Sequence, residues 1–448
     1  MNTLNSEKLT ATVLTLGCKV SQYESRAIEQ GLLESGFTVV HDARHADCIV
    51  VNTCTVTAES DRKCRQLLHR LRRENPNSFL AATGCYTQVA TNEVQALGIC
   101  DYLCGSRNKL SVVQAAELFF RREKNTPQVA VCAPDALPFE PMCVNGSERT
   151  RAYVKIEDGC ENHCSYCAIP LARGGVVSKP KEQVLAEVRG LAARGYREVV
   201  LTGIEAGSWG KDLGAERLVD LCEAVNEIPG IARIRLGSLD PSYMRSAVIE
   251  RMAKLSHLAP HFHLSVQSGC DTVLHRMRRR YRAEDVLRTL SLMREKIPNV
   301  QFTTDLLVGF PGETEEEFAK TLKFIDCAGF LYIHIFPYSR RRGTEADCLP
   351  GQLTKLQKAR RVHIASQHMQ AARMALLCDR LGKTDTVLFE TFENGFAQGH
   401  TASFLEVRVK SDTDLHNTFA EVLLREVLPD GALLAELCGT ERMKGSNV

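Results

Sequence analysis

Short apolar runs alternate with amphipathic helical stretches along most of the 448 residues. Three runs precede residue 125, at residues 11–16, 48–52 and 78–83. Six more follow, at residues 152–156, 197–202, 232–236, 261–266, 301–308 and 332–336. Because strands that alternate with helices assemble into parallel sheets, the pattern predicts an α/β protein. We expect a doubly wound parallel sheet in residues 1–124 and a partial (β/α)6 barrel in residues 151–350.

The rest of the chain predicts a linker, a helix and a small β domain. Residues 125–150 hold four prolines and little periodicity, which is typical of a linker. Residues 351–383 follow a long helical pattern. Residues 384–448 contain short alternating runs separated by polar turns, which predict a small antiparallel β-barrel. The expected strands are residues 386–390, 403–409, 418–424 and 432–437.

The composition says more about the cellular compartment of the protein than about its function. The chain is 44% apolar and 25% charged, with a net charge of only +2, so nucleic-acid binding needs a local basic patch. No apolar run is long enough for a membrane span, and we expect a cytoplasmic protein without a membrane partner. Because cytosolic thiols stay reduced, metal ligation explains some of the 18 cysteines better than disulfides do.

Three cysteines lie within eight residues directly after the first strand of the expected barrel. Cys160, Cys164 and Cys167 form a CxxxCxxC motif, and no fourth cysteine is near. Thiolates bind soft metals, but a structural zinc site is closed by four ligands. A four-iron cluster held by three cysteines keeps one iron open. Cys100 and Cys104 repeat the first spacing, but an arginine stands where the third thiol would be.

The loop resembles the CxxxCxxC signature of radical S-adenosylmethionine enzymes. The resemblance implies that the open iron chelates the methionine end of the cofactor and that the cluster's electron cleaves it. By the same resemblance we expect four further residues to contact S-adenosylmethionine. These are Tyr166 in the loop, and Gly203, Gln267 and Gly309 after later strands.

A second set of cysteines follows three strands of the N-terminal sheet. Cys18, Cys54 and Cys85 each stand just beyond one of the first three apolar runs. Parallel strands share one carboxyl edge, where open α/β sheets bind their ligands. We therefore expect these thiols to converge and to hold a second cluster with one open iron. Glycines before Cys18 and Cys85 fit the sharp turns that such a site needs.

The residues around these cysteines resemble the methylthiotransferase family. The segments that carry the likeness are residues 17–24 (GCKVSQYE), 51–57 (VNTCTVT) and 83–85 (TGC), with residues 263–269 (HLSVQSG) and 308–314 (VGFPGET) in the barrel. Residues 399–409 resemble a TRAM domain, the RNA-binding module that ends this family. The Lys-Val and Gln-Tyr-Glu residues after Cys18 are similar to those of the family members that act on threonylcarbamoyl-adenosine in tRNA. Ser21 replaces the asparagine expected there.

The resemblance implies a radical enzyme that methylthiolates C2 of that adenosine, at position 37 beside the anticodon. It implies two [4Fe-4S] clusters and S-adenosylmethionine as cofactors, with tRNA, a flavodoxin- or ferredoxin-like electron donor and a sulfur source as partners. The same chemistry on isopentenyl-adenosine tRNA or on an aspartate of a ribosomal protein stays open. A non-catalytic iron–sulfur or zinc RNA-binding protein is the alternative of another class.

Basic residues supply the remaining candidates. Arg173 follows the cysteine loop closely, and we expect it near the cluster as a catalytic residue that holds a carboxylate or phosphate. Residues 276–282 contain five arginines, which either bind RNA phosphates or form a solvated helix end. Residues 351–383 carry a net charge of +6 and are the best candidate for a phosphate-binding face. Residues 384–448 carry a net of −6.

Overall fold

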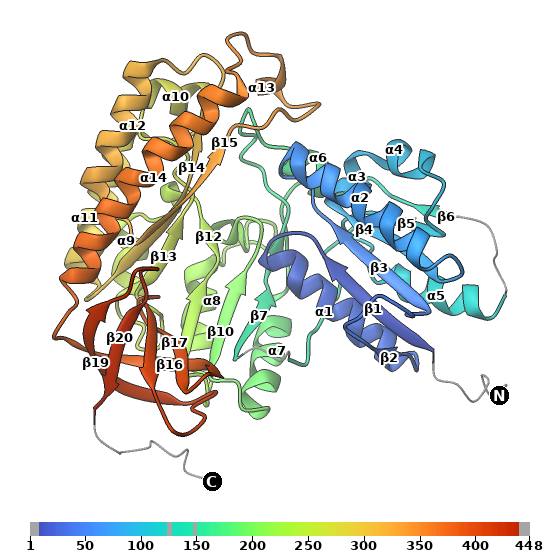
Figure 1. The fold of residues 1–448 in the computed structure, drawn as a ribbon, viewed down its shortest axis with the longest axis horizontal. Coiled ribbons are helices and arrows are strands. Elements are labelled where there is room, and N and C mark those ends of the chain that lie inside the picture. The colour runs from blue at the N-terminus through green and yellow to red at the C-terminus, as the bar shows by residue number, and fades with distance from the viewer. Residues whose placement is uncertain (1–8, 123–127, 147–149, 439–448) are drawn as a thin grey trace.

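The computed structural model describes residues 9–122, 128–146 and 150–438. The chain forms an open N-terminal sheet, a central barrel and a small C-terminal barrel (Figure 1). The open sheet lies to the right in this view, and the C-terminal barrel lies below the central one. This arrangement confirms the predicted fold class.

The N-terminal sheet has six strands, all parallel, in the order β2-β1-β3-β4-β5-β6. They are β1 (Thr10–Thr15), β2 (Thr38–Val39), β3 (Cys48–Thr53), β4 (Phe79–Gly84), β5 (Tyr102–Cys104) and β6 (Gln128–Ala130). Every residue of β3 and β4 is buried, as expected for central parallel strands that are covered on both faces. Residues 125–150 are therefore more than a linker, because β6 completes this sheet. Residues 125–127 and 147–149 lie outside the described residues.

Helices cover both faces of the sheet and enclose two apolar cores. One core packs α1 (Lys19–Glu34) and α5 (Ser111–Phe120) against the sheet. The other packs α2 (Ala58–Glu74), α3 (Cys85–Val89) and α4 (Thr91–Ala96). This is the doubly wound arrangement that the sequence predicts.

The central barrel contains the six predicted strands. They are β7 (Arg151–Lys155), β10 (Glu198–Thr202), β11 (Arg233–Leu236), β13 (His261–Leu264), β14 (Gln301–Val308) and β15 (Tyr332–Pro337). All their pairings are parallel, in two sheets of order β11-β10-β7 and β12-β13-β14-β15, where β12 is Ser238–Leu239. The barrel is thus partial. The short strands β8 (Glu157–Asp158) and β9 (Val177–Ser178) pair beside it.

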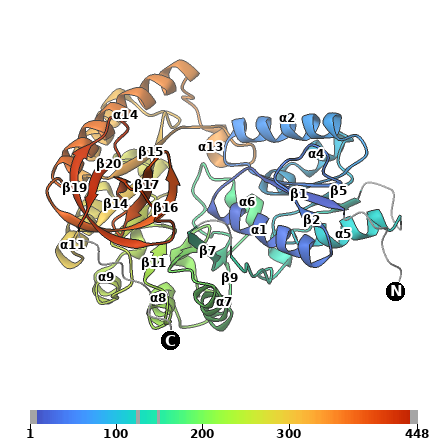
Figure 2. The ribbon, with the colours of Figure 1, turned by 60° about the horizontal axis from the view of Figure 1, so that its bottom comes forward.

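Helices surround the barrel on its outer side (Figure 2). They are α7 (Lys181–Ala193), α8 (Leu218–Asn226), α9 (Ser246–Met252), α11 (Ala283–Lys296), α12 (Glu315–Ala328) and α14 (Lys355–Cys378). Shorter helices lie in the connecting loops: α6 (Ile169–Arg173), α10 (Asp271–Arg276), α13 (Glu345–Cys348) and the 3₁₀ turns η1 (Pro134–Ala136), η2 (Ala206–Ser208) and η3 (Pro241–Tyr243). The helix predicted in residues 351–383 is α14. No helix among the described residues has the length and apolar content to cross a bilayer.

The inner face of the barrel is polar, whereas its outer face is apolar. In β11, Ile234 and Leu236 belong to the core beneath the helices. Since side chains alternate along a strand, Arg233 and Arg235 point inward. Both are buried and pair with Glu198 of β10, at 3.1 and 2.9 Å. A barrel interior filled with charges rather than branched aliphatic side chains is built to hold a polar ligand.

The C-terminal unit is a closed barrel of order β16-β17-β18-β20-β19. Its strands are β16 (Thr384–Glu393), β17 (Phe396–Thr401), β18 (Glu406–Lys410), β19 (Phe419–Val427) and β20 (Leu433–Leu437). Two expectations need correction: β17 adds a fifth strand, and β18 pairs with β20 in parallel. The alternation of β17 is interrupted by Gly399, where a Cβ would stand 2.1 Å from the Leu388 carbonyl oxygen. Residues 439–448 lie outside the described part.

The C-terminal barrel is docked onto the inner arginines of the central barrel. Arg233 donates to the carbonyl oxygens of Thr386 and His400, and Arg235 donates to those of Thr401 and Ala402. The Phe404 ring stacks on His261 at 4.6 Å, with the Arg235 guanidinium 4.8 Å from its centre. Phe404 therefore closes one end of the barrel interior.

Candidate active site

The CxxxCxxC loop starts at a glycine that the fold requires. Gly159 has a φ of 85°, and a Cβ there would lie 2.0 Å from the Gly175 carbonyl oxygen. Backbone hydrogen bonds from Cys160 to Gly174 and from Cys167 to the Cys164 carbonyl oxygen, at 3.1 and 3.0 Å, fold the loop back. All three thiols are half-buried on one loop at the carboxyl end of β7. This is the rim where barrel enzymes place their chemistry.

The electrostatics of the loop favour a positively charged metal centre. Burial raises the pKa of Cys160 and of Cys167 to about 12, and neighbouring thiols add to the shift. Neutral thiols are therefore preferred until a metal compensates the thiolate charge. Arg279 donates from Nη1 to the Cys164 sulfur at 3.2 Å, and Ile169 N donates to the Cys167 sulfur at 3.5 Å. Such donors suit the sulfurs of an iron–sulfur site.

Arg279 departs from both readings of the arginine run in residues 276–282. Its guanidinium is buried, donates to the Ser265 carbonyl oxygen at 2.6 Å and pairs with Asp240 at 3.0 Å. Arg276 pairs with Glu317 at 2.7 Å. Arg278, Arg280 and Arg282 are exposed, so a phosphate-binding surface and a solvated helix end both stay predictions for these three. The central arginine of the run faces the cysteine loop, which sequence reasoning missed because the contact spans 115 residues.

The second set of thiols lies beyond the carboxyl ends of three neighbouring parallel strands. Cys18, Cys54 and Cys85 follow β1, β3 and β4, and burial raises the pKa of Cys54 to about 11, with Cys85 and Cys18 close enough to raise it further. A Cβ at Gly84 would lie 2.5 Å from the Thr53 carbonyl oxygen, so this turn requires glycine. The Cys18 side chain is exposed, whereas Cys54 and Cys85 are buried. Two of the thiols are thus fixed in the sheet edge, and one faces solvent.

Neither thiol set forms a single-ion site among the described residues. Within residues 9–122, 128–146 and 150–438, no three His, Cys, Asp or Glu side chains converge on the position of one metal ion. A four-iron cluster binds each thiolate at a different iron atom, so its ligands stay further apart. Ser21, which replaces the expected asparagine, places its hydroxyl oxygen 3.8 Å from the Cys18 sulfur.

Arg173 links the surroundings of the two thiol sets. Its Nε donates to the Cys85 sulfur at 3.2 Å, and its Nη1 donates to Glu24 at 2.7 Å and to Asp158 at 2.9 Å. Asp158 lies two residues before Cys160, and Glu24 lies on α1. The predicted ability of Arg173 to hold carboxylates is therefore used within the protein. It is fully buried, so it does not reach substrate directly in this arrangement.

The Arg173 network carries an excess of positive charge. Lys155 pairs with Glu24 and with Asp158, both at 2.7 Å, and Lys109 pairs with Glu24 at 2.9 Å. Three cations thus share two carboxylates in a dry region beside Cys85. Burial alone raises the pKa of Glu24, but Arg173 and the two lysines hold it well below its usual range. The network joins the N-terminal sheet to the central barrel.

The predicted cofactor residues all lie on the same rim as the CxxxCxxC loop. Gly203 follows β10, Gln267 follows β13 and Gly309 follows β14. Gln267 and Gly309 have φ values of 72° and 71°, and Gly309 N donates to Glu313 at 2.6 Å. Tyr166 packs against the apolar cluster that contains Met277. Direct contact of these residues with a cofactor stays a prediction.

Glu157 is a site residue that sequence reasoning missed. Its Oε2 accepts from Glu205 N at 3.0 Å, whereas its buried Oε1 has no partner within the described chain. A Cβ at Gly203 would lie 2.4 Å from Oε2. Burial raises the pKa of Glu157 well above its usual value. A cationic group at this rim, such as the ammonium of an amino acid, would pair the orphan oxygen. The signal in the sequence was an acid three residues before Cys160.

The basic helix α14 offers less free charge than its composition indicates. Arg361 is buried and donates to Glu313 and Glu315 at 2.6 and 2.9 Å. Lys358 donates to the Tyr338 carbonyl oxygen at 2.9 Å. Arg361 is therefore excluded from a phosphate-binding face, which corrects the expectation for this residue.

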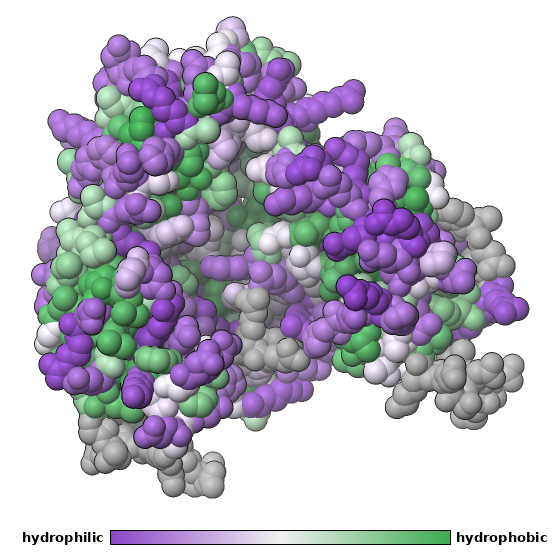
Figure 3. All heavy atoms as spheres, viewed as in Figure 1, coloured by the Kyte–Doolittle hydropathy of each residue, from purple (hydrophilic) through white to green (hydrophobic). Residues whose placement is uncertain are grey.

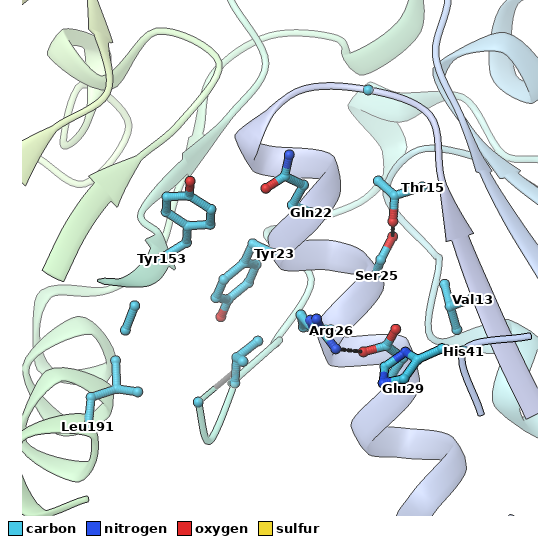
Figure 4. A pocket seen from close by; sticks show the side chains of 14 residues that line it. Val13, Thr15, Gln22, Tyr23, Ser25, Arg26, Glu29, His41, Tyr153 and Leu191 are labelled. Carbon is cyan, nitrogen blue, oxygen red and sulfur yellow. Dashed lines mark hydrogen bonds and ion pairs between the residues drawn. The ribbon is translucent and has the colours of Figure 1, made fainter. Parts of the chain in front are cut away.

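A cavity of about 320 Å³ lies beside the turn that carries Cys18 (Figure 4). Its walls come from β1, α1 and β7, and none of the six candidate cysteines lines it. Thr15 donates to Ser25, and Arg26 donates to Glu29, both at 2.7 Å. A wider hollow opens on the face shown in Figure 3, between the central barrel and the N-terminal unit.

Comparison with known families agrees with this geometry. Residues 154–325 match the family model described as the radical SAM superfamily, and residues 10–105 match the one described as uncharacterized protein family UPF0004. The first match covers the barrel and the CxxxCxxC loop. The fold and site therefore define a radical SAM protein.

Similar proteins show to which family of radical SAM proteins the chain belongs. The chain is 34% identical over 417 residues to a threonylcarbamoyladenosine tRNA methylthiotransferase MtaB of Thermotoga maritima, covering 90% of this chain and 94% of the relative. It is 35% identical to the Bacillus subtilis protein of that name, covering 91% and 92%. A tRNA-2-methylthio-N(6)-dimethylallyladenosine synthase of Carboxydothermus hydrogenoformans is 34% identical, covering 84% and 87%. The chain belongs to the tRNA methylthiotransferase family.

A solved structure supports the fold. The radical S-adenosylmethionine methyltransferase TsrM of Kitasatospora setae superposes with a TM-score of 0.56 at 16% identity, covering 76% of this chain and 77% of that one. At this identity the likeness concerns the fold alone.

Proposed function

We propose that this protein attaches a methylthio group to C2 of N6-threonylcarbamoyladenosine at position 37 of tRNA. The observation that carries the proposal is the pair of three-thiol sites whose surroundings Arg173 joins. Relatives named for this reaction align over about nine-tenths of the chain, which supports the choice of substrate. Isopentenyl-adenosine tRNA is the second candidate, because relatives named for that product are also about one-third identical.

In this proposal each thiol set binds one [4Fe-4S] cluster, and the sets are Cys160, Cys164 and Cys167, and Cys18, Cys54 and Cys85. When bound, the clusters and S-adenosylmethionine supply the electron, the radical and the sulfur that an unactivated aromatic C–H bond requires. The donor set fits, because three thiols per site leave one iron open. Metal binding also compensates the burial that raises the thiol pKa values.

The protein's own groups orient these cofactors. Arg279 and Arg173 each donate a hydrogen bond to one cysteine sulfur, one in each thiol set. Glu157 offers an unpaired carboxyl oxygen to the ammonium of S-adenosylmethionine, next to Gly203. Tyr166, Gln267 and Gly309 complete the cofactor side of the rim. Since no acid–base pair is needed, the protein contributes position and electrostatics.

The proposal also includes partners outside the chain. A flavodoxin- or ferredoxin-like protein donates the electron, and a separate sulfur source refills the site at Cys18, whose side chain is exposed. The reaction takes place in the cytoplasm, where tRNA is available. An anticodon-loop base is unpaired and can enter a pocket without breaking a base pair.

Nucleoside mass spectrometry tests the substrate. Total tRNA from cells with and without the protein is digested and compared. The methylthio form of threonylcarbamoyladenosine should be present only when the protein is present. Loss of the isopentenyl analogue instead would shift the assignment to the second candidate, and an unchanged RNA profile would overturn it.

Iron analysis tests the two thiol sets separately. The anaerobically reconstituted protein should contain about eight irons, and Cys54→Ala should retain about four. Cys164→Ala should abolish deoxyadenosine formation, whereas Cys85→Ala should preserve it and stop methylthiolation. Cys100→Ala is the matched control, because Cys100 is buried in the same N-terminal unit but outside both sets. Equal iron loss in Cys100→Ala and Cys54→Ala would refute the assignment of ligands.

A further inference from the structure

Lys19 reaches from the N-terminal unit into the interior of the central barrel. It follows Cys18 at the first turn of α1. Burial and the nearby guanidinium groups of Arg151 and Arg235 lower the pKa of Lys19, and its ammonium is close enough to act electrostatically on inward-facing groups of five barrel strands. These groups are Arg151 of β7, Arg235 of β11, His261 of β13, Asp305 of β14 and His334 of β15. One side chain can lie near groups on five strands of a barrel only if it is inside the barrel. We therefore place the Lys19 side chain in the barrel interior.

The two arginines near Lys19 already have partners, and the Asp305 carboxylate near it lies 3.2 Å from His263 Nε2. Arg151 pairs with Glu390 at 2.9 Å, and Arg235 pairs with Glu198 at 2.9 Å. In the part of the chain that the structure describes, the Lys19 ammonium makes no hydrogen bond and no ion pair, and the residue is exposed to solvent. A free cation that is surrounded by paired charges and still open to solvent is suited to an incoming anion.

A row of aromatic side chains on β15, which we call the aromatic wall, includes His334, on which Lys19 acts electrostatically. Ile333 belongs to the outer core, so Tyr332, His334 and Phe336 lie on the opposite face of β15, where the Arg373 guanidinium of α14 lies 5.7 Å from the centre of the Tyr332 ring. Tyr332 and Phe336 are 37% and 44% exposed, unusually high values for aromatic side chains on a barrel strand. The His334 ring lies 4.9 Å from Tyr332 and 6.4 Å from Phe336. Exposed rings in a row on one strand offer faces on which unpaired bases stack.

We propose that Lys19 binds the carboxylate of the threonylcarbamoyl group, while the β15 rings stack against unpaired anticodon-loop bases. This inference rests on the proposed function and adds the residue that selects its substrate. The isopentenyl group is uncharged and gives Lys19 nothing to bind. Because Lys19 adjoins Cys18, the same turn would place the substrate beside the second thiol set.

A binding experiment with synthetic anticodon stem-loops tests the role of Lys19. Three hairpins differ only at position 37, which carries the threonylcarbamoyl carboxylate, its neutral amide or the isopentenyl group. The reconstituted wild-type protein should prefer the carboxylate over the amide by about tenfold or more, since a charge-assisted hydrogen bond is lost in the amide. Lys19→Gln should bind both equally, and Lys19→Arg should keep the preference.

The controls separate this inference from the proposed function. Lys254→Gln changes an exposed lysine after α9 and should keep the wild-type preference. Lys19→Gln should still contain about eight irons, which checks that Cys18 still binds its cluster. An undiminished carboxylate preference in Lys19→Gln would overturn the inference, and equal weakening of all three hairpins would assign Lys19 to an RNA phosphate instead. Wild-type protein that modifies no threonylcarbamoyl tRNA would refute the proposed function itself.

Discussion

Glu24 pairs with all three cations of the buried network around Arg173. The substitution Glu24→Gln is therefore the most direct test of what that network does. The carboxylate accepts from Arg173 at 2.7 and 3.1 Å, from Lys155 at 2.7 Å and from Lys109 at 2.9 Å. Glu24 lies in the N-terminal unit, whereas Arg173 and Lys155 belong to the central barrel. The neutral amide would leave three buried cations with Asp158 as the only carboxylate that forms an ion pair with any of them among the described residues. The two units should then separate more easily.

The expected loss follows from breaking a buried ion pair, which costs about 3–5 kcal/mol. At roughly 2–4 °C per kcal/mol, the melting temperature should fall by about 6–20 °C. The Glu24 carboxyl has a folded pKa held well below its usual value of 4.5. Its contribution is therefore complete above that pH and is lost only as the pH falls toward the folded value. Scanning fluorimetry from pH 8 to pH 4 should show a constant deficit that shrinks only in acid.

Glu59→Gln is the matched control, because Glu59 lies on α2 of the same unit and forms an exposed pair with Arg62. Exposed pairs contribute little, so this variant should melt with the wild type. Equal melting of Glu24→Gln and Glu59→Gln would refute the claim that buried charge holds the units together. A deficit in Glu24→Gln that disappears already at pH 7 would refute the assigned pKa direction.

Three further outcomes follow from buried groups. Glu157→Gln should raise the melting temperature at pH 7–8 and change nothing below about pH 4.5, because a carboxyl with a raised folded pKa loses stability as the pH rises; an unchanged melting temperature at pH 8 would contradict this. Arg361→Ala should lower the melting temperature, since it leaves Glu313 buried and unpaired, and filter-binding titrations should show an unchanged salt dependence of tRNA binding. Phe404→Ala removes the ring stacked on His261, so limited proteolysis between α14 and β16 should accelerate; wild-type cleavage rates would argue that this ring does not hold the C-terminal barrel.

The periodic features of the fold were predictable because they depend on local patterns. Apolar runs of strand length located all the main barrel strands and the three that precede Cys18, Cys54 and Cys85. The placement of those thiols at one edge of the sheet followed from one rule, that parallel strands share a carboxyl edge. β17 was not predicted, because Gly399 and polar residues interrupt the alternation of apolar and polar residues in its sequence. In the closed barrel it is nevertheless a central strand.

The side-chain partners could not be predicted, since they join segments that are distant in the sequence. Arg173 reaches Glu24 across 149 residues, and Arg279 reaches Cys164 across 115. Arg361 was expected on a phosphate-binding face but is buried. A helical pattern cannot distinguish a buried arginine from an exposed one when its acidic partner lies outside the helix. Net charge therefore overestimated the phosphate-binding surface of α14.

The position of Lys19 explains why the protein retains the buried ion-pair network around Glu24, although such a network adds little net stability. Cys18 and Lys19 are adjacent, so the turn that carries a proposed thiol ligand also carries the lysine that we propose binds the substrate carboxylate. A shift of the N-terminal unit would move both together relative to β15. Buried ion pairs add little net stability but define position when every partner is satisfied. With Glu24 fixed only five residues after Lys19, the network fixes the start of α1 against the barrel, where thiol, cation and aromatic wall must meet.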